Sequence, residues 1–378
     1  MSLGRGAVIA IFLFINSLFI YKYGGRAFAY PEWLCVGHLL IVLGLLRYST
    51  RLPSVPTNWV VIGAVSWILL VTVAVHFVIP LSALNVDRWS VIASFWQTLT
   101  EGEYPYFARS HMGNPPGPMP IYFVVAAPFH AIGWQELLSA LGYLGAVVWI
   151  GCCSRRGIVA MLLLVTSPFL YWEIAVRSNI FTYSLLVLLG LELFLQKQNY
   201  PRAVMVGLAL STRSVFALAY VVYYLRILRR STVNSARFFW MATVSAVAFL
   251  ASFLPLLLIW PEEFHAMNPF IVQGSFLIPP VAIGLFFAGA VVASYVLGKL
   301  HPALVSGVLL FGMIAVYALY HVVQIGWSAA YLESKIDISY FLFCVPFLGY
   351  YFVASTNDSA SAVRAVPRTT AAPGSREE

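Results

Sequence analysis

Long apolar stretches separated by short polar segments fill nearly the whole chain. About twelve of them are long enough to cross, or nearly cross, a hydrocarbon core of about 30 Å. They lie at residues 7–21, 33–46, 58–80, 118–133, 137–152, 157–172, 178–196, 203–225, 238–260, 276–297, 302–322 and 338–355. Several are shorter than about 17 residues, so tilted pairs, half-helices or re-entrant segments are expected among them. The pattern predicts an all-α integral membrane protein, a polytopic bundle of about 11–13 transmembrane helices.

Composition points to the same class. Hydrophobic residues make up 61% of the chain and charged residues 10%, whereas about a quarter of a soluble domain is charged. The first apolar stretch follows only Arg5 and lacks a small-residue cleavage site, so we expect a retained anchor helix. Residues 1–355 are predicted to form one transmembrane domain. Residues 356–378, rich in Ser, Ala, Thr, Pro and charge, are predicted to be a disordered cytoplasmic tail.

The net charge of +8 is read as a topology signal and gives no argument for binding nucleic acid. With the N-terminus in the cytoplasm, Arg47, Arg51, the arginines between 226 and 237, and the basic tail all fall inside. Residues 84–120 then face the outside, which is the periplasm for a bacterial inner membrane or the lumen for an endoplasmic reticulum membrane. This count places residues 155–156, an Arg-Arg pair, on the outer face, where the positive-inside rule does not expect them.

The segment from 84 to 120 is the longest polar interruption in the chain. Within it, Trp89, Ile92, Trp96 and Leu99 recur at helical spacing, which predicts a short helix from 88 to 100 lying in the membrane interface. Asp87 stands at the start of this helix. Two interpretations remain open for it: an N-cap that satisfies backbone N–H groups of the first turn, or a chemically active carboxylate near the lipid headgroups.

After this helix, glycines and five prolines occupy residues 102–120. Proline fixes φ, so such a loop can hold side chains in place without regular structure. The polar and aromatic side chains held there include Glu101, Glu103, Tyr106, Arg109, His111 and Asn114. The alternative is an ordinary solvated loop that caps the bundle. Residues 85–117 are the predicted outer catalytic loop.

The order of these features resembles the first outer loop of the GT-C glycosyltransferases, polytopic enzymes that take sugar from a polyprenyl phosphate. An acid just past a membrane helix is followed by a short helix, by Gly-Glu-Tyr-Pro-Tyr at 102–106, and by a proline-rich entry to the next helix. The closest pattern is the branch of mannosyltransferase I of glycosylphosphatidylinositol synthesis and its bacterial relatives. Arg-Ser-Asn at 177–179, Gly-Leu-Ala at 207–209 and the segment 338–346 resemble three further patches of that branch. The family often has Asp-x-Asp, but here Asn85 replaces the first acid.

The resemblance implies an inverting hexosyltransferase, with mannose as one candidate sugar, that uses a polyprenyl-phosphate sugar donor and a lipid or glycan acceptor within membrane lipids. Sugar transfer from a lipid phosphate needs a base and positive charge for the leaving phosphate. Asp87 is the candidate base. Candidate substrate- and phosphate-binding residues are Glu101, Glu103, Tyr106, Arg109, His111, Asn114, Arg177 and Lys335. Metal dependence stays open, because Glu101 or Glu103 could join Asp87 around Mg²⁺ or Mn²⁺.

Ionisable residues inside apolar stretches form a second group of candidates. Glu173 and Arg177 stand four residues apart, which favours an ion pair on one helix face. Glu192 and Arg213 are expected to form a bridge between neighbouring helices. Two rival functions remain: a transporter or flippase for a lipid-linked saccharide, and a non-catalytic membrane partner of a glycosylation complex, which Asn85 favours. Because the chain shows no Gly-rich phosphate loop, any sugar donor is expected to be lipid-linked.

Overall fold

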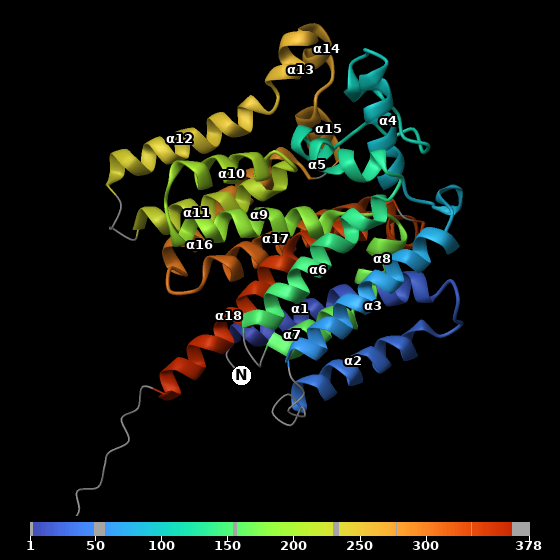
Figure 1. The fold of residues 1–378 in the computed structure, drawn as a ribbon, viewed down its shortest axis with the longest axis vertical. Coiled ribbons are helices and arrows are strands. Elements are labelled where there is room, and N and C mark those ends of the chain that lie inside the picture. The colour runs from blue at the N-terminus through green and yellow to red at the C-terminus, as the bar shows by residue number, and fades with distance from the viewer. Residues whose placement is uncertain are drawn as a thin grey trace, which may run out of the picture.

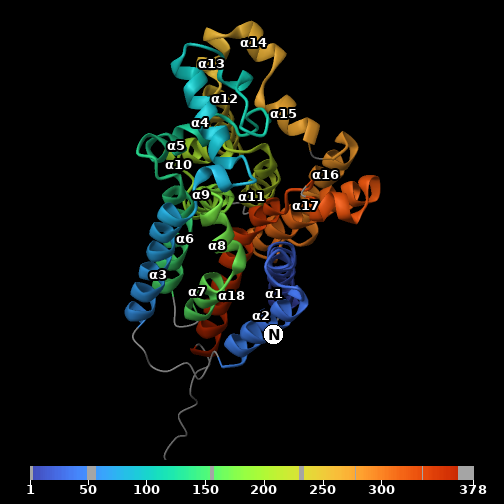
Figure 2. The same cartoon turned by 90° about the vertical axis from the view of Figure 1, so that its right-hand side faces the viewer.

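The computed structural model describes residues 3–48, 57–153, 157–229, 234–276, 278–333 and 335–364. Within these ranges every regular element is a helix, so the predicted all-α class is confirmed. Figure 1 shows the arrangement of the helices, and Figure 2 shows it from the side.

The first half of the chain forms α1 (Leu3–Phe19), η1 (Ile20–Gly24), α2 (Pro31–Arg47), α3 (Thr57–Val78), η2 (Leu81–Ala83), α4 (Arg88–Thr100), η3 (Pro105–Phe107), α5 (Pro120–Ala131), α6 (Gln135–Cys153), α7 (Gly157–Val165), α8 (Pro168–Ala175) and α9 (Ile180–Gln196). The second half forms α10 (Tyr200–Leu210), η4 (Ser214–Phe216), α11 (Ala217–Arg229), α12 (Ser235–Ala251), α13 (Leu254–Ile259), α14 (Pro261–Ala266), α15 (Pro269–Phe276), α16 (Pro280–Val296), α17 (Pro302–Ile325), η5 (Ser328–Leu332), η6 (Ile338–Cys344) and α18 (Val345–Arg364).

Four helical segments are long and apolar enough to cross a membrane: Leu3–Gly24, Thr57–Val78, Pro302–Ile325 and Ile338–Ser355. The pairs α5 with α6 and α7 with α8 also pass when each is counted as one bent segment, which gives up to six. The remaining apolar helices are shorter; they include α9, α10, α12 and α16. The chain is therefore an α-helical protein with several candidate membrane spans. The predicted number of 11–13 transmembrane helices stays a prediction.

Helices α3 and α6 pack against each other in opposite directions. At one end of the pair, a Cβ on Gly151 would lie 2.2 Å from the side chain of Val61, so the close approach requires glycine. At the other end, the His76 ring contacts the Glu136 carboxylate. Helix α6 therefore returns to the end of the bundle where α3 begins. Helix α5 is bent by 114° from α6, so this pair is a broken span or a re-entrant segment, a form expected among the shorter apolar stretches.

The antiparallel packing of α3 and α6 also bears on Arg155 and Arg156, which the predicted topology placed on the outer face against the positive-inside rule. Both arginines lie outside the described residues, but α6 ends at Cys153 on the side where α3 begins, just after α2 has ended in Arg47. The helix before the Arg-Arg pair thus ends on the side that the charge pattern assigns to the cytoplasm. The assignment of that side to the cytoplasm remains a prediction.

The two ends of the bundle differ in character. At one end Arg5 donates to Ser355, joining α1 to α18, and Arg229 donates to the carbonyls of Ser294 and Tyr295 at the end of α16. At the other end α4 runs at an angle to α3 and α6, at the upper right of Figure 1. Helix α18 continues to Arg364, beyond the predicted end of the last apolar stretch, and residues 365–378 lie outside the described part of the chain.

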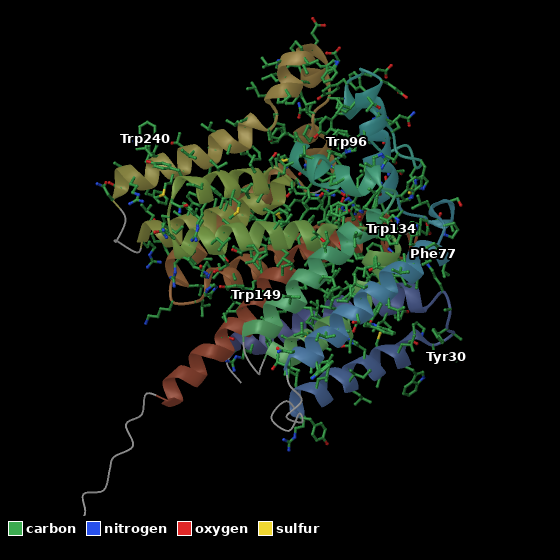
Figure 3. The ribbon with its side chains drawn as sticks, in the orientation of Figure 1. Tyr30, Phe77, Trp96, Trp134, Trp149 and Trp240 are labelled. Atoms are coloured by element: carbon green, nitrogen blue, oxygen red, sulfur yellow. The ribbon has the colours of Figure 1, made fainter. Side chains whose placement is uncertain are left out.

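The predicted short helix is present as α4, Arg88–Thr100. Its apolar face packs on α5 within the protein: Ile92 is buried, and the Phe95 ring stacks on Phe123 with centroids 3.7 Å apart. Trp96, labelled in Figure 3, donates to the Phe123 carbonyl. Elsewhere, apolar side chains such as Phe77 and Trp240 lie at the periphery and are mostly exposed, as expected for lipid-facing positions.

Candidate functional site

Asp87 lies at the N-cap position of α4, but its side chain makes no capping hydrogen bond. One carboxylate oxygen, Oδ2, accepts hydrogen bonds from the Ser110 hydroxyl at 2.9 Å and from the Asn114 amide at 2.7 Å. The carboxylate is therefore turned away from the helix that it precedes and toward the following loop. Of the two interpretations that the sequence left open, the capping role is not the one that this geometry supports.

The loop that holds Asp87 is itself tightly fixed. Ser110 accepts from the backbone N–H groups of Met112 and Asn114, and Gly113 adopts φ of +80°, a conformation that favours glycine. Tyr106 is fully buried, and its hydroxyl donates to the Pro118 carbonyl at 2.9 Å. Tyr106 thus braces the loop from inside. These contacts fix the path of the loop up to Asn114, so the side-chain amide of Asn114 is held within hydrogen-bond distance of Asp87.

A second brace connects this loop to the α13–α15 region. The Tyr104 hydroxyl donates to the Met267 carbonyl at 2.7 Å. Burial raises the pKa of the Tyr104 phenol, so it remains a proton donor. Gln273 of α15 donates to the Gly117 carbonyl and accepts from the backbone N–H and hydroxyl of Ser214. The loop, α15 and the start of η4 are therefore tied together.

His111 lies beside the first turn of α4. Its Nδ1 is 2.7 Å from the Ser90 hydroxyl, and its ring stacks on Trp89 with centroids 5.4 Å apart. The indole nitrogen of Trp89 is buried and has no hydrogen-bond partner within the described part of the chain. A buried, unsatisfied N–H is costly, so this donor is suited to an oxygen-rich ligand.

Arg88 connects the start of α4 to the last helical segment. Its guanidinium donates to the Asp337 carboxylate and, at 3.2 Å, to the Ser339 hydroxyl. It also lies 5.4 Å from the centroid of the Tyr340 ring. Lys335 is exposed in the same connection. This contact joins residues that are far apart in sequence and holds η6 against the first residue of α4.

Arg213 reaches the same tyrosine from another direction. It lies in the turn between α10 and η4 and is 8% exposed. Its guanidinium carbon is 5.7 to 5.9 Å from the ring centroids of Tyr122, Tyr340 and Phe343. Among the described residues no acidic side chain forms an ion pair with it. A buried cation without a counter-charge is unfavourable, and the second guanidinium at Tyr340 adds like-charge repulsion.

The backbone fixes the position of Arg213. The N–H groups of Met119 and Ile121 donate to the carbonyls of Thr212 and Ser211, both at 3.1 Å. This pairing holds the start of α5 against the turn that carries Arg213. Tyr122, under the guanidinium, donates to Asn179 at 2.6 Å. The site therefore combines α4, its loop, Asn179, the turn after α10, and Tyr340.

Arg177 is placed differently from the prediction. Helix α8 ends at Ala175, and Arg177 adopts a left-handed φ of +56°, so the helical i to i+4 geometry with Glu173 is lost. Arg177 instead lies 3.5 Å from Glu136 and donates to the carbonyls of Ala175 and Ile79. Glu173 accepts from Tyr143, Ser178 and the Phe181 N–H. The predicted Glu173–Arg177 pair is therefore wrong.

The expected bridge between Glu192 and Arg213 is also not among the ion pairs of the described residues. Glu192 accepts from the Tyr223 hydroxyl and lies 3.9 Å from the His301 ring nitrogen. The Arg213 guanidinium instead lies over aromatic rings, at the opposite, C-terminal end of α10.

The predicted acids of the loop are separated from Asp87. Glu101 follows α4, whose 13 residues span about 20 Å at 1.5 Å each, and Glu103 lies beyond it. Both are exposed, as is Arg109, which donates only to the neighbouring Ala108 carbonyl. Among the described residues no three His, Cys, Asp or Glu side chains gather closely enough to hold a metal ion. The proposed grouping of Glu101 or Glu103 with Asp87 around a cation is not formed.

Four residues of the site were not singled out from the sequence: Ser110, Asp337, Arg88, and Arg213 in its present role. One signal was available for Arg213. Residues 211–214 read Ser-Thr-Arg-Ser in the middle of the apolar stretch 203–225, and four consecutive polar residues at membrane depth indicate a helix break with a functional group. No comparable local signal marks Ser110 or Asp337.

Comparison with protein-family models, with curated proteins and with solved structures finds no match to this chain.

Proposed function

We propose that this protein is an integral membrane glycosyltransferase that transfers a hexose from a polyprenyl-phosphate sugar to a lipid or glycan acceptor, at the outer or lumenal membrane face. The observation that carries the proposal is a single arrangement. The Asp87 carboxylate, oriented by Ser110 and Asn114, directly precedes Arg88 in the chain. Arg88 and the buried Arg213, which has no acidic partner among the described residues, both contact the Tyr340 ring. Base and anion-binding groups are the two components that such a transfer requires.

Asp87 acts as the base in this proposal. Both loop hydrogen bonds reach Oδ2 and fix the orientation of the carboxylate. Oδ1 remains available to take the proton of the acceptor hydroxyl. The acceptor oxygen then bonds to the anomeric carbon while the bond from that carbon to the phosphate oxygen breaks. The electron pair of the broken bond stays on the phosphate, and polyprenyl phosphate leaves.

Arg213 and Arg88 stabilise the leaving phosphate. Guanidinium groups suit phosphate oxygens because they donate in a planar, often bidentate geometry. Arg88 is already engaged by Asp337, whereas Arg213 has its charge available. The buried setting strengthens its attraction for an anion, because little water screens it. The indole N–H of Trp89 offers a further donor for a sugar or phosphate oxygen.

The experiment uses purified full-length protein in liposomes with radiolabelled polyprenyl-phosphate mannose and polyprenyl-phosphate glucose. Extracted membrane glycolipids serve as acceptors. We expect release of polyprenyl phosphate together with labelled glycolipid. Movement of the intact donor across the bilayer without release would identify a flippase instead. Neither release nor movement would favour a non-catalytic partner. Transfer from a nucleotide sugar without any polyprenyl lipid would also defeat the proposal.

A further inference from the structure

A groove separate from the Asp87 site lies between η1, α2 and α8. It encloses about 460 Å³, which is within the usual range of about 300–1,000 Å³ for ligand sites. Its walls are mainly aromatic and aliphatic, with Phe19, Trp33, Leu34 and Trp172 among them. The rings of Phe19 and Trp172 lie 5.1 Å apart and form one wall. Such walls suit the hydrocarbon chain of a lipid.

One polar group in the groove lacks a partner. His38 lines it and is only 7% exposed. Its Nε2 is buried and forms no hydrogen bond within the part of the chain that the structure describes. Leaving a buried ring nitrogen unpaired is costly, so a ligand with a hydrogen-bonding atom at this point would be stabilised. A purely hydrocarbon ligand would leave the nitrogen unsatisfied.

The segment that forms one side of the groove also carries two cations. Arg26 lies 5.0 Å from the centroid of Tyr23, a groove residue. Lys22 is buried and lies 5.3 Å from the Tyr331 ring. Neither cation forms an ion pair with an acid among the described residues. The groove thus combines an apolar body, one internal hydrogen-bonding nitrogen and positive charge on the adjoining segment.

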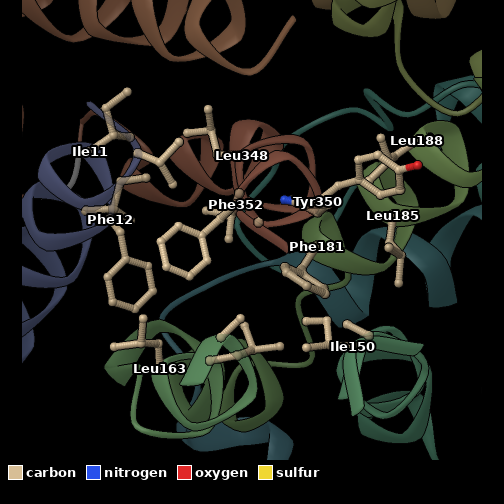
Figure 4. A pocket seen from close by; sticks show the side chains of 18 of the residues that line it. Ile11, Phe12, Ile150, Leu163, Phe181, Leu185, Leu188, Leu348, Tyr350 and Phe352 are labelled. Atoms are coloured by element: carbon tan, nitrogen blue, oxygen red, sulfur yellow. The ribbon is translucent and has the colours of Figure 1, made fainter. Parts of the chain in front are cut away.

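A second cavity serves as a comparison, because no cation is among its described lining residues. It lies between α1, α6, α7, α9 and α18 and has a volume of about 80 Å³. Figure 4 shows its lining, which includes Phe12, Leu163, Leu185 and Phe352. Almost all of that lining is aliphatic or aromatic, and no cation contributes to it. That cavity gives no basis for choosing a ligand, whereas the groove at His38 does.

We propose that the groove binds an anionic glycerophospholipid as a resident ligand. Its headgroup phosphate interacts with Arg26 and Lys22, one acyl chain lies along the aromatic wall, and His38 donates to an ester carbonyl. The ester distinguishes this ligand from a polyprenyl phosphate, whose chain has no acceptor for His38. The inference stands on the groove alone and does not depend on the proposed sugar transfer.

Native mass spectrometry of the full-length protein tests the proposal. Protein is taken from nanodiscs of equimolar dioleoylphosphatidylglycerol and dioleoylphosphatidylcholine. We expect the anionic lipid to be retained preferentially. Replacing it with its diether analogue, which lacks ester carbonyls, is expected to weaken retention about three- to tenfold, as the loss of one hydrogen bond implies. His38→Phe, which keeps an aromatic ring, should abolish the difference between ester and ether lipids.

His321→Phe is the matched control. His321 lies on α17, bonds to the Tyr317 carbonyl and does not line the groove. It should leave the preference for the ester lipid intact. The double variant Lys22→Gln, Arg26→Gln should lose the preference for the anionic headgroup. Equal retention of the ester and ether lipids by the parent protein would overturn the proposal even if His38→Phe failed to fold. Displacement of the bound lipid by an equal amount of polyprenyl phosphate would also overturn it.

Discussion

Two buried arginines show how differently the same side chain is used in this bundle. Arg177 is 2% exposed and Arg213 is 8% exposed. The charge of Arg177 is met by Glu136 and by backbone carbonyls. Arg213 lies over three aromatic rings with no acid among the described residues to pair with it. Burial alone therefore does not mark a functional arginine. The useful distinction is whether the protein itself neutralises the charge.

The surroundings follow the same contrast. Around Arg177, the carboxylate of Glu136 also contacts His76, so the network links α3, α6 and the end of α8 into a closed structural unit. Around Arg213, the guanidinium contacts the Tyr340 ring, which a second arginine, Arg88, also contacts. In the first region the protein itself supplies the counter-charge, although Nε of Arg177 has no hydrogen-bond partner among the described residues. In the second region no described acid supplies a counter-charge for Arg213.

The largest effect on stability is expected from Arg177→Ala. This change leaves the Glu136 carboxylate buried and without its cation, and breaking a buried pair typically costs about 3–5 kcal/mol. Thermal melting of the purified protein in detergent measures the loss. The double variant Arg177→Ala, Glu136→Leu removes both charges and should recover part of the stability. An unchanged melting temperature for the single variant would remove the structural role assigned to Arg177.

Arg213→Gln is expected to act on transfer and to leave folding intact. Loss of one preorganised group that stabilises transition-state charge typically lowers the rate about 10²- to 10³-fold, and no carboxylate is left unpaired by the change. The rate is measured as polyprenyl phosphate release. Arg229→Gln is the control, because Arg229 contacts the carbonyls of Ser294 and Tyr295 and the Tyr295 ring at the far end of the bundle. A rate as high as that of the parent would show that Arg213 is not part of the reaction.

Asn114→Ala and Ser110→Ala sharpen the role of the Asp87 loop. Each removes one hydrogen bond to a carboxylate, worth about 1.5–3 kcal/mol, so each should slow transfer by roughly ten- to a hundredfold. The double variant should lose less than the sum of the single effects, because both bonds orient the same oxygen. Parallel rate and melting measurements separate the two roles. A loss confined to melting temperature would make these bonds structural.

The smallest effect is expected at Arg109. Its side chain is exposed and, within the described part of the chain, donates only to the adjacent carbonyl. Arg109→Ala should therefore change stability by no more than about 0.5 kcal/mol and leave the transfer rate nearly unchanged. A large loss of transfer would restore Arg109 to the phosphate-binding role that the sequence suggested.

Local pattern was sufficient for the helices and for one residue of the site. The helical spacing of apolar residues predicted α4 at its observed bounds, and the position of Asp87 at the start of this helix drew attention to it. Both features depend only on residues that are close together in the sequence. The bend of 114° between α5 and α6 could not be predicted, because a bend leaves the apolar pattern of the sequence unchanged. The Glu173–Arg177 pair failed because i to i+4 spacing assumes a continuous helix, whereas α8 ends two residues before Arg177.

The remaining site contacts depend on tertiary structure. Arg88 and Asp337 are 249 residues apart, and Arg213 reaches Tyr340 from a different helix pair. No local spacing encodes such contacts, because they arise only when separate packing surfaces meet. A run of polar residues within an apolar stretch, such as 211–214, can indicate a candidate functional residue. It does not indicate which distant residues that side chain contacts.

The most direct test of the proposed function is sugar transfer by Asp87→Asn. Asparagine keeps a side-chain oxygen that can accept from Ser110 and Asn114, but it cannot take a proton from the acceptor hydroxyl. We predict that the variant inserts, purifies and melts like the parent, and that its rate of polyprenyl phosphate release falls roughly 10²- to 10⁴-fold, the usual contribution of a positioned base. Release at close to the parental rate would contradict the assignment of Asp87 as the base.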